Sequence, residues 1–222
     1  MPTALNNRHI FAIGDIHGQA DRLDALLGRL LGLEPAARFV FLGDYIDRGG
    51  QSRQVVDRLL ALKTERPDTV LLMGNHEATL LRYDATRSAE DLRQMRATGY
   101  QATLDSYAAA GLAGLEAMPQ AHRLFFLGLE RWFRADPYVF FHAPLPAGVD
   151  PDQADALELE RLLANRKPDT EGWRAKGLTQ VFGHVPMETP LAAPGLIGVD
   201  TNAGRGRVLT ALELPAVRFH HA

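Results

Sequence analysis

The sequence has no cysteine, no excess of basic residues and no long hydrophobic run. Without cysteine, disulfides, thiolate zinc sites and a cysteine nucleophile are excluded, so a metal ion would need Asp, Asn, Glu or His ligands. The net charge of -3 leaves no basic surplus to neutralise a phosphate backbone, so we expect no nucleic-acid partner. No apolar run reaches the length of a membrane-spanning helix, and the polar first eight residues do not resemble a signal peptide. We therefore expect no membrane association and a cytoplasmic location.

The residues that are present suit one folded domain. The chain has 222 residues, of which 46% are hydrophobic and 23% are charged, and these values are ordinary for a globular protein. A chain of this length buries most of its apolar surface without cross-links. Because no linker-like stretch divides the sequence, we expect a single domain over residues 1–222.

Apolar runs alternate with helical patterns in the first third of the chain. Leucines recur at helical spacing between Gln19 and Leu31, and a second stripe from Val55 to Leu62 ends before Pro67. Strands separated by helices pair in parallel through right-handed crossovers, and their continuous apolar character indicates burial on both faces. The predicted strands are 10–13, 39–42, 70–73, 138–141, 179–182, 196–199 and 208–214.

The remaining segments predict helices and loops. Residues 78–133 are expected to be mostly helical, with a buried helix that includes Leu124, Phe125, Leu127 and Leu129. The charged stretch from Arg82 to Met95 is either a solvated helix face or a lid. A further helix is expected from Asp152 to Ala164, and the Pro-, Gly- and Ala-rich segments 144–151 and 186–195 are expected to be loops.

Five of the predicted strands run into a side chain suited to metal binding or proton transfer. One such junction is an ordinary strand end, but five of them indicate one site, because open α/β sheets bind ligands at the carboxyl ends of their strands. The junctions are Gly14-Asp15-Ile16-His17-Gly18, Gly43-Asp44-Tyr45-Ile46-Asp47-Arg48-Gly49, Gly74-Asn75-His76-Glu77, His142 and Gly183-His184.

The first two junctions provide carboxylates, an imidazole and a guanidinium. In extended backbone Asp15 and His17 point the same way and can hold one cation, although Asp15 could equally cap the following helix. Asp44 follows its strand directly, where it can bridge two metal ions, and Arg48 can hold a phosphate or carboxylate in a bidentate fork. Taken alone, the second segment could also be a solvated turn with an Asp–Arg pair.

The other three junctions add an amide and three imidazoles. In extended backbone Asn75 and His76 point in opposite directions, so Asn75 can bind a metal while His76 faces a substrate. A histidine near a carboxylate can act as a general acid or base near neutral pH. Asn75 could also be a helix N-cap, and that role can coexist with metal binding. His142 or His184 alone would more often be a core or surface residue, and we expect that of the histidines outside the series: His9, His122, His220 and His221.

Taken in order, these motifs resemble the signature of the calcineurin-like metallophosphoesterase superfamily. GDIHG, GDYIDRG, GNHE, a later His and GH match it from about residue 10 to residue 203. The middle motifs are similar to those of the phosphoprotein phosphatase (PPP) family, which includes bacterial and phage-type serine/threonine protein phosphatases. The resemblance implies an α/β metallophosphatase fold, a central β-sandwich of two mixed sheets flanked by helices (α-β-β-α). It also implies a hydrolase of phosphoric monoesters, specifically a serine/threonine or dual-specificity protein phosphatase.

The resemblance further implies two divalent metal ions, with Mn²⁺ expected first and Fe or Zn as alternatives; oxygen and imidazole ligands suit such ions. A hydroxide bridging the metals would attack phosphorus in line with the leaving oxygen. By this resemblance the first ion would be held by Asp15, His17 and Asp44, and the second by Asp44, Asn75, His142 and His184.

The catalytic roles also follow from the resemblance. His76, oriented by Asp47, would protonate the leaving oxygen. Arg48, with Asn75, would bind the phosphoryl oxygens. A second phosphate-binding arginine is expected between the two late histidines, where Arg166 fits best and Arg161 competes.

Three places depart from the family pattern, and none removes an implied ligand. His-Ala-Gly is replaced by His142-Ala143-Pro144, Gly-His-Thr by Gly183-His184-Val185, and Asp-Thr-Gly by Asp200-Thr201-Asn202. We expect these changes to affect substrate shape more than the reaction. The chain is also shorter at its C-terminus than the eukaryotic members, so the resemblance does not imply their regulatory-subunit surfaces.

The expected partner is a phosphorylated protein or a small phosphoester. The alternatives are a diadenosine tetraphosphate hydrolase of the same superfamily, a phosphodiesterase or nuclease, and a catalytically silent metal-binding module. The Tyr-Ile-Asp-Arg-Gly and Asn-His-Glu forms favour the phosphatase. The absence of basic charge opposes a nuclease weakly, and the presence of every implied ligand, acid and arginine opposes a silent module.

Overall fold

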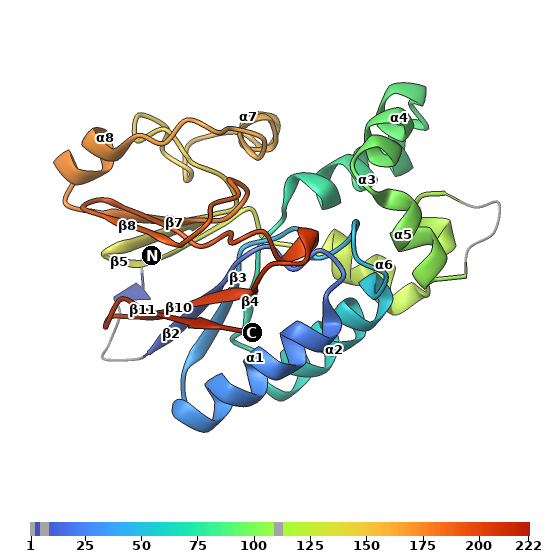
Figure 1. Cartoon of the computed structure of the whole chain (residues 1–222). Coiled ribbons are helices and arrows are strands. Elements are labelled where there is room, and N and C mark those ends of the chain that lie inside the picture. The colour runs from blue at the N-terminus through green and yellow to red at the C-terminus, as the bar shows by residue number, and fades with distance from the viewer. Residues whose placement is uncertain (1–2, 5–8, 109–112) are drawn as a thin grey trace.

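The computed structural model describes residues 3–4, 9–108 and 113–222, which form two β-sheets packed face to face (Figure 1). One sheet has the order β11-β10-β2-β3-β4 and the other the order β1-β5-β6-β7-β9-β8. The first sheet contains β2 (Ile10–Ile13), β3 (Arg38–Phe41), β4 (Val70–Leu71), β10 (Thr210–Leu214) and β11 (Arg218–His221). The second contains β1 (Thr3–Ala4), β5 (Trp132–Asp136), β6 (Tyr138–Phe141), β7 (Thr179–Phe182), β8 (Leu191–Ala193) and β9 (Leu196–Gly198).

Both sheets are mixed. β2, β3 and β4 pair in parallel, as their separation by helices predicted, while β10 joins β2 antiparallel. In the other sheet β6, β7 and β9 are parallel and β5 is antiparallel to β6. The carboxyl ends of β2, β3 and β4 therefore lie at one edge of the first sheet. Those of β6 and β7 lie at one edge of the second sheet.

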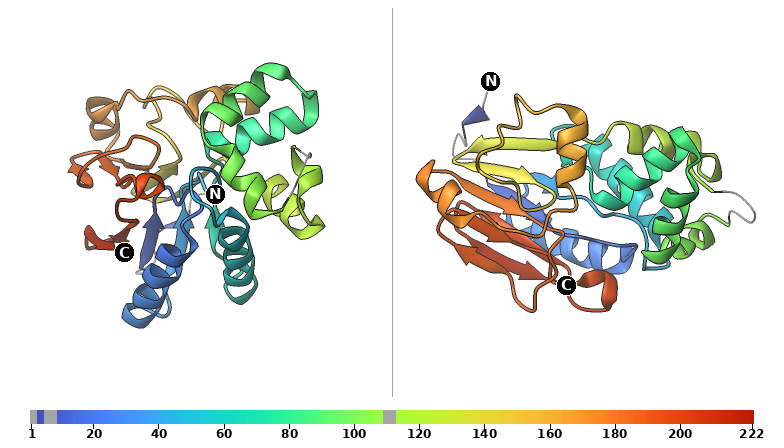
Figure 2. Two further views of the ribbon diagram at one scale, coloured as in Figure 1. Left: turned by 45° about the vertical axis from the view of Figure 1, so that its right-hand side comes forward. Right: turned by 90° about the horizontal axis from the view of Figure 1, so that it is seen from above.

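Helices cover the outer faces of the sandwich and one of its ends (Figures 1 and 2). α1 (Ala20–Leu33) and α2 (Ser52–Glu65) pack on the first sheet, and α7 (Ala156–Leu162) and α8 (Thr170–Ala175) lie over the second. A helical group at the end of the sandwich contains α3 (Asn75–Thr86), α4 (Ala89–Ala97), α5 (Tyr100–Ser106) and α6 (Gln120–Leu127). Two short 3₁₀ helices are η1 (Leu115–Ala117) and η2 (Ala203–Arg205).

The central strands β2 and β6 are buried on both faces, which explains their unbroken apolar sequences. Ile10 and Ala12 belong to the core between the sheets, together with Phe140 of β6. The alternate residues Phe11 and Ile13 belong to the second core, which the helices contribute to. Because successive strand residues point to opposite faces, burial on both sides requires apolar residues at every position.

Several elements differ from the sequence-based expectation. β5 begins at Trp132, inside the stretch predicted to be helical, and its residues are mostly half-buried, so it shows no clear alternation. β8 lies in a predicted loop, because three residues paired with β9 are too few to show a period. β11 is an edge strand that sequence reasoning missed. The helix expected from Asp152 begins only at Ala156, where Asp155 caps it by accepting a hydrogen bond from the Glu158 amide.

Burial on α6 also differs from the prediction. Leu124 and Leu127 are 61% and 64% exposed, and Leu129 lies beyond the helix end. Phe125 and Leu129 are buried as predicted, and Phe126 is buried as well. The apolar run is longer than one helix face, so periodicity alone could not identify which side packs.

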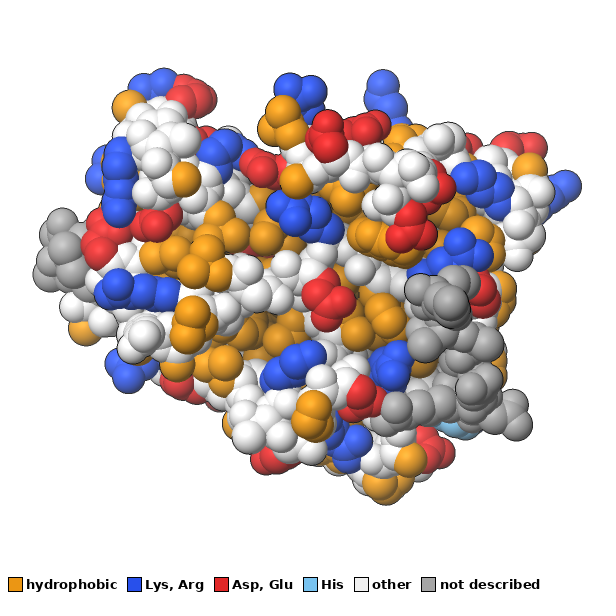
Figure 3. Space-filling model, turned by 180° about the vertical axis from the view of Figure 1, so that it is seen from behind, with side chains coloured by type: hydrophobic (Ala, Val, Ile, Leu, Met, Phe, Trp, Pro, Cys, Tyr) orange, Lys and Arg blue, Asp and Glu red, His pale blue; other side chains and the backbone are white. Residues whose placement is uncertain are grey.

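The described helices include none long and apolar enough to cross a membrane. On the face behind Figure 1, Lys and Arg side chains are interspersed with Asp and Glu (Figure 3). The surface seen there therefore does not present one sign of charge.

Candidate active site

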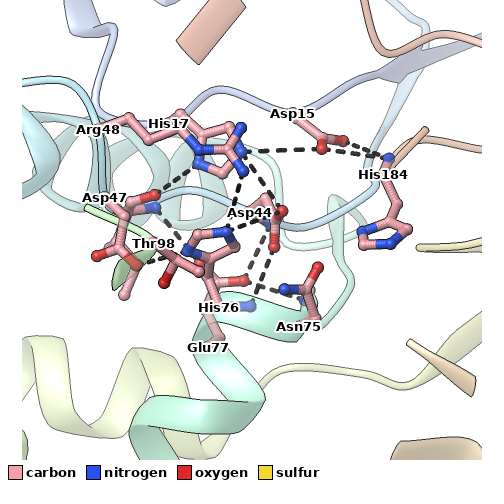
Figure 4. Close-up of polar contacts among 12 residues, drawn as sticks. Asp15, His17, Asp44, Asp47, Arg48, Asn75, His76, Glu77, Thr98 and His184 are labelled. Carbon is pink, nitrogen blue, oxygen red and sulfur yellow. Dashed lines mark hydrogen bonds and ion pairs between the residues drawn. The ribbon is translucent and has the colours of Figure 1, made fainter. Parts of the chain in front are cut away.

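The five predicted junctions converge at the carboxyl edges of the two sheets. Figure 4 labels residues of every junction except His142, whose Nε2 lies 3.1 Å from Asn75 Oδ1. Asp15 follows β2, Asp44 follows β3, and His184 follows β7. All three side chains are at most 6% exposed. Hydrogen bonds from the His184 amide to both carboxylate oxygens of Asp15, at 3.0 and 3.2 Å, join residues 169 apart in sequence. The site is thus assembled across the interface of the two sheets.

Left-handed backbone is concentrated at this site. Among the described non-glycine residues with positive φ, five belong to it: His17, Asp44, Asp47, Arg48 and His184. This conformation costs roughly 1–2 kcal/mol for an L-residue, so surrounding contacts must hold it. One such contact is a close approach at Gly43 (φ +106), where a Cβ would lie 2.5 Å from the Gly74 nitrogen. Only glycine fits there, and its lack of a side chain allows the loop after β3 to contact the loop after β4.

Glu77 holds the turn after β3. It is fully buried, and its carboxylate accepts hydrogen bonds from the amides of Asp44, Tyr45 and Gly74 at 2.9, 2.8 and 3.0 Å. Burial and the neighbouring Asp44 carboxylate raise the pKa of Glu77 to about 7. We assigned Glu77 no role from the sequence, although a Glu three residues into a helix is the pattern of a capping box.

Asn75 and His76 are the first residues of α3, with Gly74 as the N-cap. The expectation of an extended backbone was therefore wrong here, and so was Asn75 as the cap. Helical geometry still separates the two side chains by about 100°. Asn75 Oδ1 lies 3.1 Å from His142 Nε2, whereas His76 Nδ1 lies 2.5 Å from Asp47 Oδ2. Likewise Asp15 is not a helix cap, because α1 begins after Gln19.

Asp44 is central to two groups of candidate metal ligands. One group is Asp44 with His17 and His76, and the other is Asp44 with His142 and His184. Asp44 Oδ2 lies 3.4 Å from His17 Nε2, and Oδ1 lies 3.5 Å from His142 Nε2. Burial opposes ionisation of Asp44, but the surrounding histidines outweigh it and hold its pKa well below the ordinary value.

The histidines present free ring nitrogens to the site. Nδ1 of His17 donates to the Ile46 carbonyl at 2.8 Å, and Nδ1 of His142 donates to the Leu42 carbonyl at 2.8 Å. A ring whose Nδ1 carries the proton keeps its Nε2 lone pair for a metal. Burial lowers the pKa of both His17 and His184 to about 3. These neutral imidazoles are the ligand form that metals require.

The donor set fits divalent cations. Nε2 of His17 and Nε2 of His184 are buried and have no hydrogen-bond partner among the described residues. Burial, and then the nearby carboxylates of Asp200 and Asp44, raise the pKa of Asp15 well above its ordinary value. A cation would satisfy the free nitrogens and relieve the repulsion among the carboxylates. Asp200 is buried beside this set, and sequence reasoning gave it no role.

The His76 ring lies between the Asp47 carboxylate and the Arg48 guanidinium. Its Nδ1 contacts Asp47, and its Nε2 lies 3.3 Å from Arg48 Nη2. Burial opposes protonation, but the carboxylates of Asp44 and Asp47 outweigh it and raise the pKa of His76 to about 9. Arg48 is only half-buried, and its backbone amide donates to the Gly99 carbonyl at 3.1 Å. Gly99 was also not anticipated from the sequence.

The second arginine lies beyond α7. Arg166 is exposed. Burial lowers the pKa of His184, and the charges of His142 and Arg166 lower it further, while Asp44 opposes them. The adjacent Asn165 donates to the Pro144 carbonyl at 2.7 Å, which ties this loop to the strand end that carries His142. Arg161 lies in the last turn of α7 and is exposed. The charged stretch that begins at Arg82 is tied to α7, because Arg82 bonds Glu160 and the buried Asp91.

Two departures from the family pattern have local explanations. Asn202 has φ 68°, a left-handed conformation that glycine adopts freely and that asparagine tolerates better than most residues. Its amide donates to Asp200 at 2.8 Å, so the turn is preserved. Pro144 is buried and provides its carbonyl to Asn165.

A two-sheet sandwich with aspartates, an asparagine and histidines at its strand ends is the architecture of metal-dependent phosphoester hydrolases. The model of the calcineurin-like phosphoesterase family matches residues 8–195, and the chain belongs to that family. A serine/threonine-protein phosphatase of Schizosaccharomyces pombe is 44% identical over 70 residues. That match spans 31% of this chain and 22% of the relative.

Solved structures of phosphatases share the fold. A diadenosine tetraphosphatase has a TM-score of 0.70 at 21% identity, over 99% of this chain and 95% of the other. The cold-active protein-tyrosine phosphatase of a Shewanella species has a TM-score of 0.67 at 19% identity, over 100% and 82%. A serine/threonine phosphatase of Saccharomyces cerevisiae has a TM-score of 0.65 at 17% identity, over 98% and 80%. The chain thus shares the metallophosphoesterase fold with these enzymes.

Proposed function

We propose that this phosphoesterase is a phosphomonoesterase of the serine/threonine protein phosphatase type, active as a single domain over residues 1–222. The observation that carries the proposal is the His76 imidazole, which lies between Asp47 and Arg48 beside the Asp44 carboxylate. This arrangement brings together the proposed proton donor His76, the proposed phosphate-binding Arg48 and the proposed shared metal ligand Asp44. A cytoplasmic location belongs to the same proposal. So does the absence of a nucleic-acid partner, which the net charge of -3 supports.

Two metal ions, with Mn²⁺ the first choice and Fe or Zn the alternatives, would be held by the clusters around Asp44. Metal ions in such sites acidify water to supply the nucleophile and stabilise charge on the phosphoryl oxygens. Asp44 has an oxygen toward each cluster, which supports its assignment to both ions. The proposed ligands are Asp15, His17 and Asp44 for one ion, and Asp44, Asn75, His142 and His184 for the other.

The protein's own groups would do the rest of the chemistry. His76 protonates the leaving oxygen from Nε2, while Asp47 holds Nδ1 and orients the ring. Arg48 and Arg166 match the charge on the equatorial oxygens, and Asn75 contributes its amide. Arg166 is preferred to Arg161 because its charge helps to lower the pKa of His184, and this effect requires Arg166 to lie near the site.

The competing proposal is hydrolysis of diadenosine tetraphosphate, favoured by the fold shared with a diadenosine tetraphosphatase. A substrate panel separates the two. The purified protein with Mn²⁺ is given phosphoserine, phosphothreonine and phosphotyrosine peptides, an aryl phosphate and diadenosine tetraphosphate, with a chelator as control. We expect phosphate release from the peptides and the aryl phosphate, abolished by the chelator. Release of ADP far faster than release of phosphate would overturn the phosphatase assignment.

A further inference from the structure

Thr103 is a buried hydroxyl of α5 that reaches the site from outside every motif. It is fully buried and lies 56 residues beyond Asp47 in sequence. Its Oγ1 lies 2.7 Å from Asp47 Oδ1 and 2.8 Å from the Asp47 amide nitrogen. Thr103 therefore contacts both the side chain and the backbone of the residue that holds His76.

The direction of these hydrogen bonds follows from donor counting. An ionised Asp47 carboxylate has no proton, so the single Thr103 hydroxyl proton must go to Oδ1. Thr103 Oγ1 then acts as acceptor for the Asp47 amide and for the Ser52 hydroxyl, which lies 3.1 Å away. The two hydroxyl protons therefore run from Ser52 to Thr103 and from Thr103 to Asp47. The Asp47 amide is shared between Thr103 Oγ1 and Ser52 Oγ, which lies 3.2 Å from it.

The other carboxylate oxygen of Asp47 is the one that contacts His76. Oδ2 lies 2.5 Å from His76 Nδ1, while Oδ1 is occupied by Thr103. Asp47 has φ 72°, so it is held in left-handed backbone by contacts rather than by its own preference. With both oxygens and the amide engaged, Asp47 has one orientation, and that orientation sets the plane of the His76 ring.

We propose that Thr103 is a positioning residue for phosphoester hydrolysis, which fixes Asp47 and through it the proton-donating nitrogen of His76. This inference rests on the proposed function, in which His76 protonates the leaving oxygen. Thr103 touches no substrate. Its effect is confined to the step that needs a correctly aimed His76, which is loss of the leaving group.

The test compares two substrates in four purified, Mn²⁺-loaded proteins. A phosphoserine peptide has a poor alkoxide leaving group that needs a proton, whereas 4-nitrophenyl phosphate has a good leaving group that needs it less. The proteins are wild type, Thr103→Val, Thr103→Ser and Thr69→Val. Thr69 is a matched control, because it is buried before β4 and its hydroxyl has no hydrogen-bond partner in the described chain.

We expect Thr103→Val to lower kcat on the phosphopeptide by about 10- to 100-fold, the usual loss when a residue that orients a site group is removed. The loss on the aryl phosphate is expected to be several times smaller, with KM little changed. Thr103→Ser keeps the hydroxyl and should restore most of the activity, and Thr69→Val should match wild type. Equal losses on both substrates, or no loss, would overturn the proposal.

A double-mutant cycle excludes general damage. In the background of His76→Asn the Thr103→Val change should have little further effect, because the group that it positions is gone. A full additional loss there would contradict the inference. If Thr103→Val does not fold, Ser52→Ala takes its place, because it removes the donor that orients the Thr103 hydroxyl. An equal loss on both substrates in Ser52→Ala would also contradict the inference.

The same data separate this inference from the proposed function. Wild-type protein that releases no phosphate from either substrate refutes the function itself. Wild-type activity with a Thr103→Val variant that behaves like Thr69→Val refutes only the role of Thr103.

Discussion

Asp44 is the residue on which both halves of the site depend. Its Oδ1 lies nearest His142 and its Oδ2 nearest His17, and its Oδ1 also accepts from the His76 amide at 3.2 Å. Replacing one oxygen by an amide nitrogen would remove the charge that the two proposed ions would share. No other described side chain belongs to both groups of candidate ligands.

Asp44→Asn is therefore expected to lose metal and activity together. We expect fewer than two bound Mn²⁺ per chain by elemental analysis, and phosphate release reduced by at least about 100-fold. The control is Asp24→Asn, at an exposed aspartate of α1 paired with Arg58. A variant with two bound ions and full activity would disprove the shared-ligand role.

His76→Asn tests the proton donor without touching the proposed metal ligands. It should retain both ions and slow hydrolysis of a phosphoserine peptide by about 10²–10⁴-fold, with a smaller loss on an aryl phosphate. The matched control is His122→Asn, which removes a buried histidine bonded to Tyr107 and Asp57 on the far side of α5. Its loss of stability should leave the ratio of the two rates unchanged. Equal losses in His76→Asn on both substrates would rule out the acid role.

The candidate ligands could be predicted because each directly follows an apolar strand, and this pattern is visible in sequence. Glu77 and Thr103 could not be given roles in the same way. Their importance comes from contacts with the Asp44–Asp47 turn, at separations of 33 and 56 residues, which only the folded chain creates. Asp200 is similar, since its effect on Asp15 arises from proximity.

At the scale of elements, the turn between α4 and α5 supports Arg48. Gly99 has φ +105, and a Cβ there would lie 2.9 Å from the Arg48 nitrogen and 3.1 Å from its Cα. The Gly99 carbonyl also accepts from the Arg48 amide. The helical group thus positions Arg48, the proposed phosphate-binding residue, through backbone contact.

Gly99→Ala is expected to displace Arg48 and weaken substrate binding. We expect KM for an aryl phosphate to rise by roughly tenfold, the loss of about one charge-assisted hydrogen bond, with a lower melting temperature. The control is Gly28→Ala within α1, where a Cβ would meet nothing within 4 Å. That change should stabilise the protein by about 0.5–1 kcal/mol. Unchanged kinetics in Gly99→Ala would show that Arg48 does not need this support.

The elements that could be predicted are those with long or doubly buried patterns. β2 and β6 are apolar throughout, and β3 and β7 end in apolar residues, because both faces of these strands are covered. β5 and β8 are only partly buried, and β11 lies at an edge, so their sequences resemble loops or helices. Pairing with neighbours, rather than local preference, creates these strands.

At the scale of the whole molecule, the site joins the two sheets. Asp15 and Asp44 come from the ends of β2 and β3, whereas His142 and His184 come from the ends of β6 and β7 in the other sheet. The sheets otherwise meet through apolar contacts such as Ile10, Val40, Phe140 and Val181. Bound metal would therefore act as a cross-link at one end of the sandwich.

This arrangement predicts that metal stabilises the entire fold. Ions that bind only the folded chain add about 2.7 kcal/mol at a concentration 100 times Kd, and for a chain of this size that corresponds to roughly 5–10 °C in Tm. We expect calorimetry to show this rise when Mn²⁺ is added to chelator-treated protein. Asp44→Asn should show little of the rise, because it loses a ligand to both clusters. The same shift in wild type and Asp44→Asn would mean that the stabilising ions bind elsewhere, and that the strand ends do not cross-link the sheets.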